Sequence, residues 1–259
     1  MIPEYDRLAD IYDVWVQSGP AAEPCRRFYV DMCRTLRDPV VELGIGTGRI
    51  AIEIARLGVP ITGIDVSPAM TALCQKKFEE AGLQHQLSLL ISDVRHFELP
   101  EPAPLIIFPY QSIGYLPAYE DKLALLHCVR RNLKPGGRFI FDHYILDKTR
   151  AHALHGIPQL TRRTPEQGAT SPWIWTVFHF DFSKQLIDCS VIIDEVDDAS
   201  TLLRRTYRSL SFSWIEPDQV QDLLRQANLK VQTAYGDFNG SPLTPTSEQQ
   251  IWVAERPIE

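Results

Sequence analysis

The fold of this chain is decided by residues 39–55, which read PVVELGIGTGRIAIEIA. The apolar run at 39–43 predicts a buried strand, the alternating glycines predict a tight turn, and 49–57 has the pattern of a helix. Glycine carries no side chain and tolerates positive φ, so such a turn lets the backbone approach a ligand. A tight turn needs glycine whether or not anything binds. The stretch therefore predicts a strand, a loop and a helix of the nucleotide-binding type, and other segments must show what binds.

Spacing and charge indicate which nucleotide this loop would bind. Dinucleotide loops read G-x-G-x-x-G and place a pyrophosphate at the helix N-terminus, whereas here the glycines alternate at 44, 46 and 48. The preceding strand ends in Glu42, whose carboxylate would repel a pyrophosphate and attract a cationic amino-acid head group. The sequence therefore disfavours a nicotinamide-dependent reductase.

Carboxylates also follow the next two predicted strands. The strand at 61–65 ends in Asp65, and the strand at 87–92 is followed by Asp93. Asp65 could accept both ribose hydroxyls, and Asp93 could accept from an adenine amine. Each acid taken alone is more often a helix cap or a solvated loop residue. Three acids at three successive strand ends predict a single nucleoside site.

With these segments in place, the chain resembles the class I S-adenosylmethionine-dependent methyltransferases over most of its length. The resemblance is carried by E-x-G-x-G-x-G at 42–48, GIDVS at 63–67, Ser92-Asp93, and LKPGGR at 133–138 before a fifth strand. The N-terminal stretch 5–13, YDRLADIYD, is similar to the lid opening of members that act on small molecules. The resemblance implies S-adenosyl-L-methionine as the cofactor and assigns its contacts to Tyr12, Glu42, Gly44, Gly46, Gly48, Asp65, Val66, Asp93 and Val94.

Predicted strands and helices alternate along the chain, which is typical of a parallel sheet covered on both faces. Strands are expected at 39–43, 61–65, 87–92, 105–109, 138–142, 229–235 and 250–255, and helices at 49–57, 68–81, 121–133 and 216–227. The expected fold is α/β, a doubly wound seven-stranded Rossmann-like methyltransferase sheet with an antiparallel β insertion after the fifth strand. By the resemblance, the last strand runs antiparallel to the others. The expected domains are an N-terminal helical lid at 1–37, the cofactor-binding core at 38–145 and 214–259, and the insertion at 146–213.

The insertion interrupts this alternation. It begins irregular and Pro-rich, and then gives strand-like segments at 173–182, 186–196 and 202–212, which predict an antiparallel meander. The first segment has two partly apolar faces: Trp173, Trp175, Val177, His179 and Asp181 on one, and Ile174, Thr176, Phe178, Phe180 and Phe182 on the other. A roof over the substrate and a contact between subunits both fit this pattern. The roof is favoured, because the insertion follows the carboxyl end of the fifth strand.

Length, charge and cysteine usage narrow the class of protein. A chain of 259 residues with 44% hydrophobic residues can bury one large core plus a modest appendage. Its net charge of −7 offers no electrostatic footprint for phosphate backbones, so no nucleic-acid partner is expected. The five cysteines contain no C-x-x-C pair, no leader pattern is seen, and no apolar run approaches the roughly 20 residues of a membrane span. A cytoplasmic location without membrane contact is expected.

Methyl transfer from S-adenosylmethionine places few demands on the protein, because the sulfonium of the cofactor is already a good leaving group. The chain must hold the nucleophile near contact distance and remove its proton when necessary. His143, just beyond the fifth strand, is the best candidate for the general base, and its alternative is a bond to a neighbouring backbone carbonyl. Tyr110, beyond the fourth strand, is the second catalytic candidate, and its alternative is a packed aromatic. Substrate contacts are expected from Gln111, Tyr144 and His179.

The histidine spacing and the end of the fourth strand indicate which metals and substrates to expect. His152 and His155 have the spacing of metal ligands on a helix, but no third ligand is evident, so no metal site is expected. Enzymes that methylate amines of DNA bases carry Asp, Asn or Ser before Pro-Pro and an aromatic residue at the fourth strand, whereas Phe108-Pro109-Tyr110 offers no such acceptor. The expected function is methyl transfer to a nitrogen or oxygen of a small metabolite. A homo-oligomer contact through the insertion is the alternative to its role as a roof. The alternatives are a non-catalytic S-adenosylmethionine-binding or scaffold protein of the same fold and, less favoured, an RNA base methyltransferase.

Overall fold

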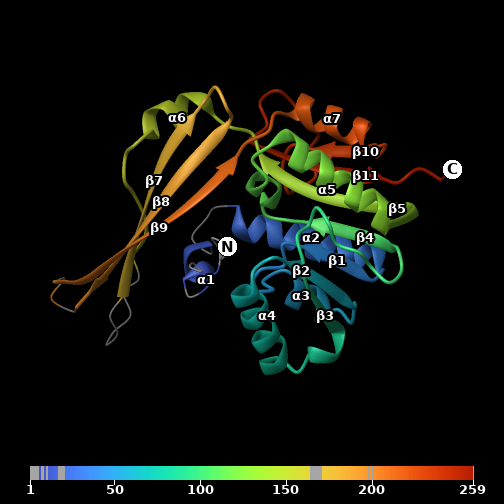
Figure 1. Ribbon diagram of the computed structural model, residues 1–259, viewed down its shortest axis with the longest axis horizontal. Coiled ribbons are helices and arrows are strands. Elements are labelled where there is room, and N and C mark those ends of the chain that lie inside the picture. Colours follow the sequence, from blue (N-terminus) through green and yellow to red (C-terminus); the bar gives the residue numbers. More distant parts are fainter. Residues whose placement is uncertain are drawn as a thin grey trace.

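A seven-stranded sheet forms the centre of the protein (Figure 1). The computed structural model describes residues 6, 9, 11–16, 21–163, 171–197, 199 and 201–258. The strands lie in the order β10 (Lys230–Tyr235), β11 (Gln249–Glu255), β5 (Leu133–Tyr144), β4 (Ala103–Phe108), β1 (Val40–Leu43), β2 (Ile61–Asp65) and β3 (Leu87–Ile91). β11 is antiparallel to both of its neighbours, and the pairs from β5 to β3 are parallel. The expected parallel sheet with an antiparallel last strand is confirmed.

Helices cover both faces of this sheet (Figure 1). One face carries α5 (Tyr119–Asn132) and α7 (Pro217–Gln226), and the other carries α2 (Ala22–Leu36), α3 (Ala51–Ala55) and α4 (Pro68–Glu80). Because β1 lies between β2 and β4, the chain order reverses there, and the carboxyl ends of these strands border a crevice. Among the helices of the described residues, none is both long and apolar enough to cross a membrane.

Local sequence signals explain where α4 and α7 begin. The Ser67 hydroxyl accepts a hydrogen bond from the Met70 N–H at 3.1 Å, and Pro68 follows in the first turn of α4. α7 begins with a capping box formed by Glu216 and Gln219. Both helices begin where the sequence predicts.

β5 begins at Leu133, five residues before the expected start at 138. Leu133 pairs with Ala103 and Arg138 pairs with Leu105, so the register shifts between these pairs. Gly136 lies in this irregular segment with φ +76, a conformation that suits glycine. The Pro-Gly-Gly segment, expected to precede the strand, is therefore an irregular part of it.

The segment between β5 and α7 forms a second, antiparallel sheet of four strands, here called the insertion sheet. It contains β6 (Gln159–Arg163), β7 (Ser171–Asp181), β8 (Leu186–Val196) and β9 (Leu202–Ser213), preceded by α6 (Lys148–Leu154). The three-stranded meander is confirmed, whereas α6 and β6 lie where the sequence was read as irregular. α6 has seven residues, too few to show a helical period. Its one local signal is Asp147, whose side chain accepts from the Arg150 N–H.

The inner face of the insertion sheet packs on α1 (Tyr12–Val16). Its buried residues, among them Ile174 and Leu210, contact Trp15, and the ring of Phe212 lies 5.8 Å from that of Tyr115. In Figure 1, α1 lies between the insertion sheet and the central sheet. Within the lid expected at 1–37, residues 1–5, 7, 8, 10 and 17–20 lie outside the described residues.

Candidate active site

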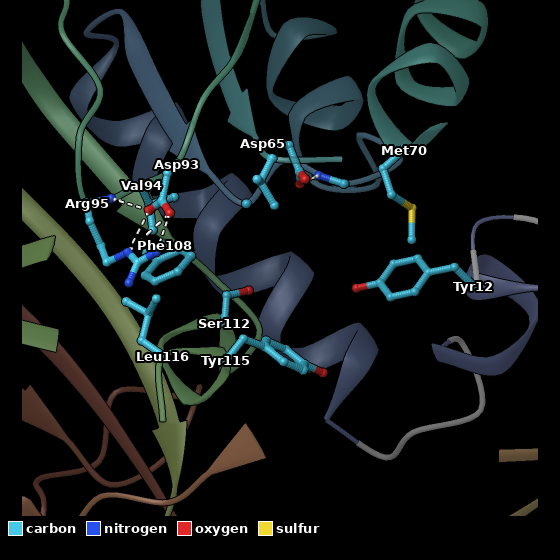
Figure 2. Close-up of a pocket in the computed structure, with 13 residues that line it drawn as sticks. Tyr12, Asp65, Met70, Asp93, Val94, Arg95, Phe108, Ser112, Tyr115 and Leu116 are labelled. Carbon is cyan, nitrogen blue, oxygen red and sulfur yellow. Dashed lines mark hydrogen bonds and ion pairs between the residues drawn. The ribbon is translucent and has the colours of Figure 1, made fainter. Parts of the chain in front are cut away.

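A cavity of about 250 Å³ opens at the carboxyl ends of β1, β2 and β4. Figure 2 shows Tyr12 and Met70 on one side of it and Arg95, Val94 and Phe108 on the other. The cavity is lined by Tyr12, Gly44, Gly46, Asp65, Val66, Met70, Asp93, Val94, Arg95, Phe108, Ser112, Tyr115 and Leu116. It adjoins a smaller recess, here called the inner recess, lined by Tyr12, Glu42, Gly44, Ile45, Thr47, Arg49, Ile50, Pro109, Tyr110 and Ser112. Every predicted cofactor residue except Gly48 lines one of the two.

The glycines of the loop serve two purposes. Gly44 and Gly46 line the cavity with φ +60 and +55, so their backbone is open to a ligand. Gly48 has φ +77, and a Cβ added there would lie 2.6 Å from the Cys74 Sγ. Gly48 therefore allows the loop to pack against α4, and the structure does not place it at the cavity.

Asp65 ties the glycine loop to the start of α4. Its Oδ2 accepts the Gly46 N–H and its Oδ1 accepts the Ser67 N–H, both at 2.8 Å. Burial raises the pKa of this carboxyl, and the hydrogen bonds from these backbone groups oppose that rise. A carboxylate has about four acceptor positions, so Asp65 keeps capacity for hydroxyl groups in the cavity.

Asp93 lies at the opposite end of the cavity, where Arg95 binds it. The Arg95 guanidinium donates to both carboxylate oxygens of Asp93 and also to Asp121 at 2.5 Å. Hydrogen bonds from Arg95 hold the pKa of Asp93 below its usual value. Arg95 escaped the sequence analysis, because an arginine in a loop after a strand gives no pattern of its own.

The inner recess holds one acidic and one basic side chain, Glu42 and Arg49. Glu42 is 3% exposed, and burial raises its pKa to about 8, although Arg49 opposes that rise. Its Oε2 makes no hydrogen bond within the described residues. The Arg49 guanidinium carbon lies 4.8 Å from the centre of the Tyr110 ring. An unpartnered carboxylate oxygen and a guanidinium fit the ammonium and carboxylate groups of an amino acid.

The sequence analysis also missed Arg49, although a signal was available. Arg49 directly follows the loop at the start of the helical segment, where the partial positive charge of a helix disfavours a cation. A cation in that position indicates a compensating anion nearby, and Glu42 lines the same recess.

α1 brings Tyr12 over the cavity and is fastened to the core by Asp13. The Thr47 hydroxyl donates to Asp13 Oδ1 at 2.6 Å, and the Lys77 ammonium forms an ion pair with Asp13 Oδ2. Burial raises the pKa of Tyr12, so its phenol stays protonated. Tyr12 therefore offers a neutral aromatic wall above the glycine loop.

The comparison with known families agrees with this geometry. Residues 40–137 match a family model described as a methyltransferase domain. The chain carries a methyltransferase domain, as the class I S-adenosylmethionine-dependent methyltransferases do. Its cofactor is S-adenosylmethionine.

Three relatives show how far the likeness extends. The putative methyltransferase YqeM of Bacillus subtilis (strain 168) is 20% identical over 255 residues, which is 97% of each chain. The CcbJ methyltransferase from Streptomyces caelestis is 18% identical with a TM-score of 0.84, covering 99% of both chains. The sugar N-methyltransferase KedS8 from Streptoalloteichus sp ATCC 53650 is 16% identical with a TM-score of 0.72, covering 95% of this chain and 93% of that one. At these identities, the two solved structures show a shared fold.

The catalytic and substrate candidates of this methyltransferase are spread over three places. Tyr110 lines the inner recess, whereas Gln111, next to it, lies outside both linings. His143 is 1% exposed and also lies outside them, and burial together with Lys122 lowers its pKa to about 3. The Tyr144 ring lies 4.4 Å from the His143 ring, away from the cavity lining. His179 is exposed on the outer face of the insertion sheet, 5.5 Å from the His155 ring.

The placement of His143 differs from the one a general base requires. It is buried behind the cavity, and an imidazole with so low a pKa holds a proton poorly at neutral pH. Over the described ranges, no group of three His, Cys, Asp or Glu side chains is arranged to hold a metal ion.

Proposed function

We propose that this methyltransferase transfers the methyl group of S-adenosylmethionine to a nitrogen or oxygen of a small metabolite, and that an amine is the preferred acceptor. The observation that carries the proposal is the lining of the cavity and its recess, to which no histidine of the described residues contributes. A neutral amine brings its own lone pair, whereas a hydroxyl needs a base to remove its proton.

Four other titratable groups of the lining are not available as bases for a hydroxyl acceptor. Burial raises the pKa of Tyr110 to about 12 and raises that of Tyr12 as well, so neither is a phenolate near neutral pH. Asp93 is bound by Arg95. The pKa of Glu42 would suit a base, but Glu42 lies in the inner recess, where it would hold the ammonium group of the cofactor. KedS8, which shares this fold, is a sugar N-methyltransferase, and that likeness supports a nitrogen acceptor.

The residues of the site fit the cofactor by charge and shape. Glu42 and Arg49 would hold its amino-acid end, Asp65 its ribose, and Asp93 the adenine amine. The apolar side chains of Val66, Met70 and Val94 line the same cavity and would contact the adenine ring. The bound cofactor supplies a methyl group on a positively charged sulfur. The chain supplies orientation and, through α1 and the insertion sheet, a roof that excludes water.

The roof itself is an interpretation that the packing supports. The inner face of the insertion sheet contacts Trp15 of α1 and Tyr115, and α1 and Tyr115 border the cavity.

We further propose a cytoplasmic location and no nucleic-acid partner, as expected from the charge and the cysteines. Assembly of copies through the insertion sheet is likewise part of the proposal.

The test is the formation of S-adenosylhomocysteine with matched acceptors. The full chain would be incubated with S-adenosylmethionine and pairs of small sugars that carry an amine or a hydroxyl at one position, and the products identified by mass spectrometry. Methylation of the amino sugars alone supports the proposal, and methylation of the hydroxyl compounds alone assigns an oxygen acceptor. Tight cofactor binding without product from any acceptor would favour a binding or scaffold role.

A substitution at Asp65 tests whether this residue binds the ribose of the cofactor. Asp65→Ala is expected to weaken S-adenosylhomocysteine binding by roughly 1–3 kcal/mol, the scale for a lost buried partner of a hydrogen bond. Calorimetric titration measures the change. Asp188→Ala is the control, because Asp188 is exposed on the insertion sheet, where it accepts from Ser211 at 2.7 Å. Equal affinity of the Asp65 variant and wild type would reject the assignment.

A further inference from the structure

A buried carboxylate outside the cavity lining holds the turn that follows β4. Asp142, near the end of β5, is 0% exposed. Its Oδ1 accepts hydrogen bonds from the Tyr110 N–H and the Tyr29 hydroxyl, both at 2.8 Å, and its Oδ2 accepts the Gln111 N–H at 3.0 Å. The Cys25 Sγ lies 3.8 Å from Oδ1. Asp142 thus connects α2, which carries Tyr29 and Cys25, to the turn after β4.

The turn bound in this way has an uncommon backbone. Tyr110 has φ +59 and Gln111 has φ +62, so two consecutive residues with side chains occupy the left-handed region. Residues that carry a Cβ populate this region sparsely, and they stay there when surrounding contacts determine the conformation. The N–H groups of both residues donate to Asp142, so its carboxylate holds them in this conformation.

The conformation of the turn decides where the Tyr110 side chain points. Its ring lies in the inner recess under the Arg49 guanidinium, at 4.8 Å. Its hydroxyl donates to the Val16 carbonyl, the last residue of α1, at 3.3 Å. A change in the turn would therefore displace the Tyr110 ring from Arg49 and the Tyr110 hydroxyl from α1 at the same time.

We propose that Asp142 is a positioning residue, which sets the affinity of the inner recess for the amino-acid end of the cofactor by holding Tyr110 in place. The inference rests on the proposed function, because it places that end of the cofactor beside Arg49. A carboxylate suits this task since both of its oxygens accept. An asparagine would present its NH2 group to one of the two N–H donors.

The test is the affinity of the full chain for S-adenosylhomocysteine, measured by calorimetry beside thermal unfolding. Asp142→Asn is expected to weaken binding at least about tenfold, because one N–H of the turn loses its acceptor. Adding Gln111→Gly to that variant is expected to restore most of the affinity, because glycine adopts positive φ readily. Gln111→Gly alone is the reference for this rescue.

Tyr29→Phe is the matched control. It removes one hydrogen bond to Asp142 at 2.8 Å and leaves both N–H bonds of the turn in place. We expect Tyr29→Phe to lower the unfolding temperature and to leave the affinity for S-adenosylhomocysteine within about threefold of wild type. Loss of stability without loss of affinity would separate the structural role of this contact from the positioning role of Asp142. An affinity loss equal to that of Asp142→Asn would make the effect one of general stability and overturn the proposal.

Two other results would overturn it: wild-type affinity in Asp142→Asn, or no recovery in the double variant. If Asp142→Asn does not fold, Tyr110→Leu carries the test, because it keeps both N–H groups on Asp142 and removes the ring. It is expected to show a similar loss of affinity, and wild-type binding there would also overturn the proposal. Failure of the wild-type chain to bind S-adenosylhomocysteine would instead reject the proposed function.

Discussion

At the scale of single residues, Glu42 makes cofactor binding depend on protons. Burial raises its pKa to about 8 in the free protein, so at pH 7 the carboxyl is mostly protonated. An ammonium group in the inner recess favours the carboxylate, so binding releases a proton. Affinity for S-adenosylhomocysteine is expected to rise up to about tenfold per pH unit as the pH increases toward 8, because below its pKa the group must first ionise.

Calorimetry of wild type and Glu42→Gln between pH 6.5 and 8, in two buffers of different ionisation enthalpy, measures this release. The range stays above the pKa of Asp142, which burial raises to about 6. Glu42→Gln is expected to bind more weakly at pH 8 and to lose the pH dependence. A wild-type affinity that stays constant over the range would show that Glu42 is not the group that meets the ammonium.

The strand-end acids could be located from the sequence, whereas the side to which each residue of β5 points could not. β5 is a central strand covered on both faces, so apolar residues occur on both of its sides. The sequence around Asp142, His143 and Tyr144 therefore has no alternation of apolar and polar residues that would tell one side from the other. The position of His143 near the edge of the sheet predicted a base, and the fold buries its ring away from the cavity. Strand order therefore predicts which edge holds the ligand, and side-chain direction needs the structure.

At the scale of elements, one lysine of α4 helps to hold α1 on the core. Lys77 pairs with Asp13 of α1, whereas its neighbour Lys76 pairs with Glu80 of its own helix at 3.7 Å. Lys77→Ala is expected to speed the dissociation of S-adenosylhomocysteine about three- to tenfold, because α1 opens more readily. The change in unfolding free energy should stay below about 1 kcal/mol, since the Lys77 and Asp13 side chains are 32% and 30% exposed.

Lys76→Ala is the control for this pair, with the same change of charge on the same helix. Stopped-flow dissociation of the labelled ligand compares the two variants. Raising the salt concentration should speed release from wild type and leave Lys77→Ala unchanged, because salt screens an exposed pair. Equal dissociation rates for both variants and wild type would mean that the pair of Lys77 and Asp13 does not hold α1 over the ligand.

At the scale of the whole molecule, the two faces of the insertion sheet differ. Its inner face is buried against α1, and its outer face carries Trp173 and Trp175, with ring centres 6.4 Å apart. Tyr207 and Leu160 on the outer face are 67% and 44% exposed. The charges of Asp194 and Arg205 on the same face pair at 2.6 Å and cancel. The apolar patch that Trp173, Trp175, Tyr207 and Leu160 form on this face is typical of a contact between proteins.

A second copy of the chain is the partner that we expect on this outer face. With a net charge of −7, two copies repel each other, so their association needs an apolar contact such as this one. Tyr207→Arg is expected to raise the dimer dissociation constant at least about tenfold, since buried tyrosines contribute strongly at interfaces. Ile258→Arg is the control, because Ile258 is 77% exposed near the C-terminus and outside the insertion sheet. Sedimentation at micromolar concentration measures both, and a wild-type chain that sediments as a monomer would contradict the expectation.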